Sequence, residues 1–209
     1  MKKITLLFAS VFVVFAVMGA EAYRIDSGGG PEIGFAIGGA YPSAPGQAGF
    51  DSAVKFNYGI NDIFSIGLES GFGWVSQKDY EPLPNSPVKY ITSVDFYSVP
   101  ILAMATFSFS ADQYSPTSFY VSAGAGWSWT RLSGFFGDTT KTFSGLTYQA
   151  LVGFAYDFGQ EAGNMKLFCE VGYRGANVKK DIENVNLELD MSAPFARVGV
   201  AFPLGGSAF

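Results

Sequence analysis

The fold of this chain is decided by residues 53–74, which read AVKFNYGINDIFSIGLESGFGW. On both sides of the turn signal Asn61-Asp62, large apolar residues alternate with small or polar residues. A period of two predicts β-strands, and two such strands around a turn signal predict an antiparallel hairpin.

The register of this hairpin follows from the parity of its apolar positions. A two-residue loop would pair Ile60 with Ile63, and it would set the apolar face of one strand against the polar face of the other. A three-residue loop at 61–63 pairs Ile60 with Phe64 and keeps the two apolar faces together. The sequence therefore predicts a three-residue turn, which is a common hairpin type.

The same alternation recurs along the rest of the chain. Strands are predicted at residues 32–40, 53–60, 64–74, 89–109, 118–131, 142–157, 165–174 and 185–202. Long connections are predicted at 41–50, 75–88, 132–141 and 175–184, and short turns at 61–63, 110–117 and 158–164. This alternation of long and short connections is typical of an all-β, eight-stranded, antiparallel up-and-down transmembrane barrel.

Two of the predicted strands are irregular. Pro100 interrupts the strand at 89–109, and an interior strand tolerates proline only at a bulge or an edge. In the strand at 185–202, the alternation changes phase near Pro194. We therefore expect a bulge or a sheet edge at Pro100.

The first 22 residues have the pattern of a cleavable signal peptide. A basic Lys-Lys pair is followed by an apolar run at 4–17 and an A-x-A cleavage site at 20–22. The apolar run is shorter than the roughly 20 residues that a spanning helix needs, which argues against a membrane anchor. We expect residues 1–22 to be removed and residues 23–209 to form the barrel domain.

The composition does not suit a surface that faces water. Charged residues make up 15% of the chain, against roughly 25% in typical soluble domains. Without Lys2, Lys3 and Glu21, the chain has 11 basic and 17 acidic residues, a net charge of −6. An acidic chain without a basic stripe argues against nucleic acid as a partner. One cysteine and no histidine exclude an internal disulfide and a Cys/His metal site, and no cofactor is expected.

Alternation alone leaves open whether the apolar face points inward or outward. A soluble, secreted, lipocalin-like barrel that binds a small apolar ligand would turn this face inward. The opposite face, however, is mostly Gly, Ser and Ala, which fit the crowded interior of an eight-stranded barrel. The bulky apolar face is therefore predicted to contact lipid.

Aromatic residues are predicted to form two girdles around this apolar band. Those at the turn end of the strands are Tyr58, Phe64, Phe107, Phe109, Phe119, Tyr156 and Phe202. Those at the loop end are Trp74, Trp129 and Tyr173. Two girdles that flank an apolar band are typical of a transmembrane barrel.

The same assignment of faces sends charged residues into the lumen. They are Lys55, Glu69, Glu170, Arg174 and Arg197. Because a lone buried charge costs several kcal/mol, residues of mixed sign in a confined space predict ion pairs. These pairs could form a plug that stabilises the barrel or line a gated ion path, and the plug is favoured.

Five segments together carry a family resemblance. They are YGINDIFSIGLESGFGW, FYSVPILAMATFSF, FYVSAGAGWSW, LFCEVGYRG and FARVGVAF. In this order they resemble the small eight-stranded outer-membrane proteins of the OmpA/OmpX type, over the whole mature chain. The resemblance implies a monomer in the outer membrane of a Gram-negative bacterium, in contact with lipid and lipopolysaccharide. It also implies insertion by the barrel-assembly machinery, which would read Phe202 or Phe209 as the terminal aromatic.

These observations favour a non-enzymatic barrel with a structural or surface-interaction role. The absence of histidine excludes a Ser-His catalytic arrangement. A narrow channel is less favoured, because eight strands leave a filled interior. Aromatic residues in the long loops could contact an unidentified extracellular ligand, pack against one another or touch lipopolysaccharide. They are Tyr41, Phe50, Tyr80, Phe135 and Phe136.

Overall fold

The computed structural model describes residues 30–82, 89–110, 115–133, 141–182 and 185–204. The strands in these residues are β1 (Pro31–Ala40), β2 (Gly49–Gly59), β3 (Phe64–Pro82), β4 (Lys89–Ser110), β5 (Thr117–Ser133), β6 (Lys141–Asp157), β7 (Lys166–Ile182), β8 (Val185–Asp190) and β9 (Ala193–Pro203). A short 3-10 helix, η1 (Gln160–Ala162), lies between β6 and β7. No helix in the described part of the chain is long and apolar enough to cross a membrane. The predicted signal peptide and Phe209 lie outside the described residues.

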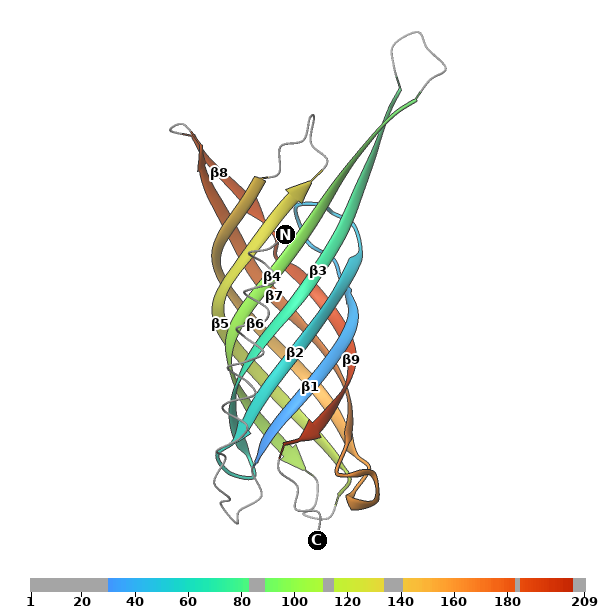
Figure 1. Ribbon diagram of the computed structural model, residues 1–209, viewed down its shortest axis with the longest axis vertical. Coiled ribbons are helices and arrows are strands. Elements are labelled where there is room, and N and C mark those ends of the chain that lie inside the picture. Colours follow the sequence, from blue (N-terminus) through green and yellow to red (C-terminus); the bar gives the residue numbers. More distant parts are fainter. Residues whose placement is uncertain (1–29, 83–88, 111–114, 134–140, 183–184, 205–209) are drawn as a thin grey trace.

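The strands close into an antiparallel barrel (Figure 1). From β1 to β7, each strand pairs with the next one in the chain. The ring closes because β9 pairs with both β7 and β1. Among the described strands, β8 pairs with the outer part of β7 and continues the line of β9. The prediction of a closed eight-stranded all-β barrel is confirmed.

The β2–β3 hairpin has the register that the sequence predicts. Tyr58 lies opposite Ile66, and the N–H of Ile60 donates to the carbonyl of Phe64 at 2.9 Å. The side-chain oxygen of Asn61 accepts the N–H of Phe64 at 2.7 Å, which stabilises the turn from within. The connection between the strands is therefore a three-residue turn.

Between the two aromatic bands, the large apolar side chains point outward. The exposed members include Phe35, Ile37, Ile66, Leu68, Val121, Leu146, Val152, Val171 and Val198. Leu146 is 63% exposed, whereas the inward-facing Leu102 is fully buried. A soluble lipocalin-like barrel would show the reverse arrangement. The outer face is therefore an apolar surface fitted to hydrocarbon.

Two of the four predicted long loops are mostly strand. Strand β3 continues through the predicted loop 75–88 as far as Pro82, and β7 continues through 175–184 as far as Ile182. The prediction of loops was wrong because these segments alternate with the opposite polarity. Their apolar residues face inward, where Val75, Val94, Phe96, Phe143, Ala176, Val178 and Met191 form a core.

The change of phase near Pro194 leaves the pairing of the strands unbroken. Asn177 pairs with Asp190 and Arg174 pairs with Ala193, so β8 and β9 meet β7 in one continuous register. What changes between β9 and β8 is the medium that surrounds the barrel, which passes from lipid to water. Beyond the membrane the outer face meets water, and Leu189 of β8 packs against the inner core, whereas Val198 and Phe202 of β9 are exposed on the outer face.

Pro100 lies neither at a bulge nor at an edge, contrary to the sequence-based expectation. Ser70 pairs with Ile101 and Gly73 pairs with Ser98, so the register between β3 and β4 is the same on both sides of the proline. Because proline has no N–H, the pairing is interrupted at this point. The hydroxyl of Ser70 donates to the carbonyl of Pro100 at 3.1 Å.

The outward direction of the apolar face predicts a position-dependent cost for a charge. Leu68→Arg, between the two aromatic bands on β3, should lower the free energy of unfolding by about 2–4 kcal/mol. Ser76→Arg is the matched control, because Ser76 shares the parity of Leu68 but lies beyond Trp74. The control should cost less than about 1 kcal/mol. Urea unfolding in liposomes measures both, and equal costs would contradict the assigned position of the membrane.

Candidate functional site

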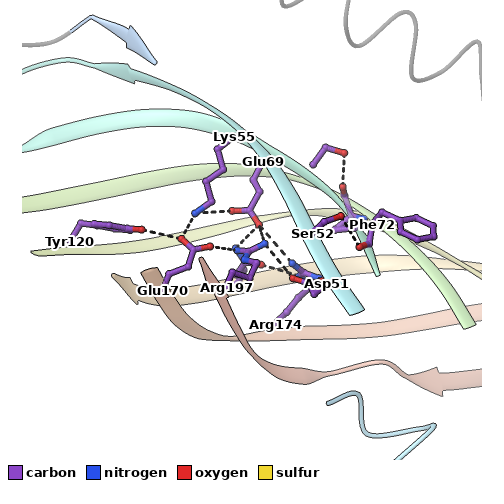
Figure 2. Close-up of polar contacts among 12 residues, drawn as sticks. Asp51, Ser52, Lys55, Glu69, Phe72, Tyr120, Glu170, Arg174 and Arg197 are labelled. Atoms are coloured by element: carbon purple, nitrogen blue, oxygen red, sulfur yellow. Dashed lines mark hydrogen bonds and ion pairs between the residues drawn. The ribbon is translucent and has the colours of Figure 1, made fainter. Parts of the chain in front are cut away.

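The most distinctive interior feature is a cluster of ionisable side chains that point toward one another in the lumen (Figure 2). The lumen charge cluster consists of Asp51, Lys55, Glu69, Glu170, Arg174 and Arg197. Its members come from β2, β3, β7 and β9, on both sides of the seam that closes the barrel. Three carboxylates and three cations make the cluster neutral as a whole.

Arg197 lies at the centre of the cluster, and its side chain is fully buried. Its Nη1 lies 2.9 Å from an oxygen of Glu69 and 3.4 Å from an oxygen of Asp51, while its Nη2 lies 2.7 Å from an oxygen of Glu170. The guanidinium also stacks over the ring of Phe195, at 4.3 Å from its centroid. One arginine therefore joins all three carboxylates.

Lys55 and Arg174 complete the cluster. Lys55 forms an ion pair with Glu170 and lies 3.7 Å from Glu69. Arg174 lies 3.0 Å from Asp51 and 3.7 Å from Glu69. Each carboxylate therefore contacts at least two cations, which offsets the cost of burying it.

Two neutral side chains on β5 and β6 extend this network. Gln149 donates to Glu69 and accepts from Nε of Arg174, both at 2.9 Å. The hydroxyl of Tyr120 donates to Glu170 at 3.1 Å. A Cβ added to Gly153 would lie 2.1 Å from the ring of Tyr120, so this position needs glycine for the tyrosine to reach the cluster.

The structure brings all five charged residues singled out from the sequence into one cluster. Asp51, Gln149 and Tyr120 also take part in this network and are not among the residues predicted from the sequence. Asp51 shares the parity of Lys55, which is a usable signal, but it directly follows a predicted loop. Gln149 lies on the small-residue face of its strand, where an isolated amide gives no sign of its partners.

Apolar side chains fill the lumen on both sides of the lumen charge cluster. On the turn side, Ala36, Ala53, Ala155, Phe168 and Ala201 pack together. On the loop side lies the core around Phe96 and Val178. A cavity of about 30 Å³ between this core and the cluster is lined in part by Asp51, Ser98 and Arg174, and it is large enough for one water molecule. The described lumen is thus a packed interior.

The residues predicted to form girdles lie on the outer face at the expected ends. Trp74, Trp129 and Tyr173 are exposed at the loop end. At the turn end, Phe107, Phe109, Phe119, Tyr156 and Phe202 are exposed, and Tyr58 and Phe64 are half-buried. The rings of Phe64 and Phe107 lie 4.9 Å apart.

The predicted loop contacts have different surroundings. Tyr41 is 52% exposed directly after β1, and its hydroxyl donates to the carbonyl of Gly46. Phe50 lies in β2 opposite Trp74, so it belongs to the upper aromatic band rather than to a loop. The side chain of Tyr80 and both Phe135 and Phe136 lie outside the described residues.

The lumen charge cluster predicts a large cost for removing one cation. Arg197→Met should lower the free energy of unfolding by about 3–5 kcal/mol, because three buried carboxylates would then face two cations. Arg197→Met with Glu69→Gln restores the balance and should cost less than the single change. Lys166→Met is the control at the more exposed Lys166–Glu32 pair, and it should cost about 1 kcal/mol or less. Urea unfolding in liposomes tests all three, and equal losses at Arg197 and Lys166 would contradict this account.

Comparison with known proteins agrees with this geometry. The sequence matches the family described as Outer membrane protein beta-barrel domain over residues 10–202. The structure is similar to Neisserial surface protein A, with 20% identity, a TM-score of 0.58, and coverage of 85% of this chain and 97% of that one. It is also similar to OprG from Pseudomonas aeruginosa, with 13% identity, a TM-score of 0.50, and coverage of 86% and 98%. No curated protein sequence gives a significant match. The chain therefore belongs to the outer membrane protein beta-barrel family, and it lies in the outer membrane of a Gram-negative bacterium with its apolar face in lipid.

Proposed function

We propose that this protein is a non-conducting, non-enzymatic barrel that acts through its extracellular surface, as a structural element of the envelope or as a contact for external molecules. The observation that carries this proposal is the neutral lumen charge cluster, which lies between two packed apolar layers. A lumen filled in this way supports a role outside the barrel.

Ion conduction is the second candidate function, and the cluster argues against it. An ion could pass only if several ion pairs of the lumen charge cluster separated. The side chains of Glu69, Glu170 and Arg197 are at most 2% exposed, so separation would leave charges without solvation. The plug role is therefore preferred to a gated path for Lys55, Glu69, Glu170, Arg174 and Arg197.

The chemistry of the interior supports a non-enzymatic role. The sequence has no histidine to act as a general base beside a nucleophile. Glu69 and Glu170, the buried carboxylates nearest to an acid/base pair, are both held by cations. Within the described residues, no group of His, Cys, Asp and Glu side chains could hold a metal ion.

The proposal also covers the export of the protein, its insertion into the membrane and the lipids around it. We expect cleavage after Ala22, a monomer whose apolar band is covered by lipid, and lipopolysaccharide around the upper aromatic band. Strand β9 ends at Pro203, and Phe202 is exposed on its outer face beside β1. These positions support Phe202 as the aromatic read by the barrel-assembly machinery.

Planar-bilayer recording tests the proposed closure of the lumen. The purified mature protein should insert without producing steady ion-conducting steps, because the ion pairs block the lumen. The neutral variant Lys55→Ser with Glu69→Ser removes one cation and one anion, and it should conduct more than the wild type. Heat-dependent gel mobility controls for folding of both proteins. Steady conduction by the folded wild type would overturn the proposal.

A further inference from the structure

Asp51 on β2 and Arg174 on β7 face each other in the lumen, and a single hydrogen bond joins them (Figure 2). Nη1 of Arg174 donates to Oδ1 of Asp51 at 3.0 Å. Both residues are more than nine-tenths buried. The other carboxylate oxygen, Oδ2, and the other terminal nitrogen, Nη2, make no hydrogen bond with the described residues. The pair therefore retains one unused acceptor and one unused donor.

The neighbouring charges of the lumen charge cluster do not satisfy these two atoms. Oδ2 of Asp51 lies 3.4 Å from Nη1 of Arg197, and Nη2 of Arg174 lies 3.7 Å from an oxygen of Glu69. Both contacts are ion pairs, and neither is a hydrogen bond. A buried polar atom without a hydrogen bond is costly, and such atoms in proteins are commonly satisfied by ordered water.

A cavity of about 30 Å³ lies beside this pair. Asp51 and Arg174 both line it, together with Ser98, which carries a hydroxyl, and Gly73. A Cβ added to Gly73 would lie 3.7 Å from Oδ1 of Asp51 and 3.7 Å from Cβ of Ser98, so the glycine leaves this space open. A cavity of this size holds one water molecule.

We propose that this cavity binds one water molecule, which donates a hydrogen bond to Oδ2 of Asp51 and accepts one from Nη2 of Arg174. The hydroxyl of Ser98 supplies a third partner, and about three partners are usual for a buried water. The water joins β2, β4 and β7 and completes the hydrogen bonding of the plug. This inference concerns the interior and goes beyond the proposed surface role.

The charges around the cavity favour a neutral ligand over an ion. An anion beside Arg174 would also lie against the carboxylate of Asp51, and a cation beside Asp51 would lie against the guanidinium of Arg174. The cluster is already neutral as a whole, so either ion would add an uncompensated buried charge. Water both donates and accepts hydrogen bonds, and it can therefore satisfy the two unused atoms together.

A crystal structure of the full mature protein tests the site directly. We expect one solvent peak in the cavity, at about 2.7–3.2 Å from Oδ2 of Asp51 and from Nη2 of Arg174. Crystals soaked in bromide or rubidium salts test the ionic alternatives, because these ions give an anomalous signal that water lacks. A dry cavity in a map that shows other enclosed waters, or an anomalous peak in the cavity, would overturn the inference.

Filling the cavity provides a second test, through the sign of a change in stability. Gly73→Ala adds a methyl group that takes up part of the cavity and displaces the water. Its equilibrium constant for unfolding by urea in liposomes should rise about fivefold, because the hydrogen bonds of the water are lost. Gly34→Ala is the matched control, since a Cβ added at this buried position would contact the apolar Phe168 at 3.5 Å. Its equilibrium constant should fall about two- to fivefold, because alanine restricts the unfolded chain.

The outcomes separate this inference from the proposed function. A gain in stability for Gly73→Ala equal to that for Gly34→Ala would mean that the cavity is dry, and the inference would be wrong. Crystals of Gly73→Ala should lack the solvent peak but keep the hydrogen bond between Asp51 and Arg174, which assigns the loss of stability to the water. Bilayer recording is independent. A silent barrel with a dry cavity refutes only the water site, whereas a conducting barrel refutes the proposed closed lumen.

Discussion

The whole structure depends on the absence of hydrogen-bonding partners in the hydrocarbon core of a bilayer. An unpaired backbone group costs several kcal/mol there, so a sheet can cross only as a closed ring. This chain closes the ring by pairing β9 with both β7 and β1. At Pro100 the pairing of β3 with β4 is interrupted, and the hydroxyl of Ser70 donates to the carbonyl of Pro100 beside the interruption.

Closure with only eight strands creates a narrow lumen, and the narrowness explains the interior chemistry. Most inward positions hold small residues, and the large polar ones must find partners across the lumen. Arg197 joins carboxylates from β2, β3 and β7, while Gln149 and Tyr120 connect β6 and β5 to the same cluster. A buried balanced cluster contributes little net stability compared with apolar packing, but a mispaired arrangement would be costly. The cluster thus favours one arrangement of the strands around the lumen.

The polarity of the outer face follows the medium along each strand. Within the membrane, apolar side chains such as Leu68 and Leu146 face outward. Above the upper aromatic band the outer face meets water, and Val75, Phe96 and Val178 point inward as in a soluble β-protein. The backbone keeps its register through this change, as the pairing of β7 with β8 and β9 shows. One chain therefore contains a lipid-facing barrel and a water-facing extension of the same sheet.

Local alternation in the sequence was enough to determine the three-residue turn after Ile60 and the eight strands of the barrel, because both depend on parity between neighbours. The outward direction of the apolar face was predicted from the small Gly, Ser and Ala residues of the opposite face. Alternation could not determine where strands end above the membrane. The prolines of 75–88 and the charged residues of 175–184 predict loops, but both segments continue as strand in the described residues. Nor could it bring Asp51 to Arg174, since they lie on β2 and β7, which are not neighbouring strands, and meet across the lumen. This contact depends on ring closure, and the ends of β3 and β7 depend on unequal strand lengths; only the tertiary structure decides both.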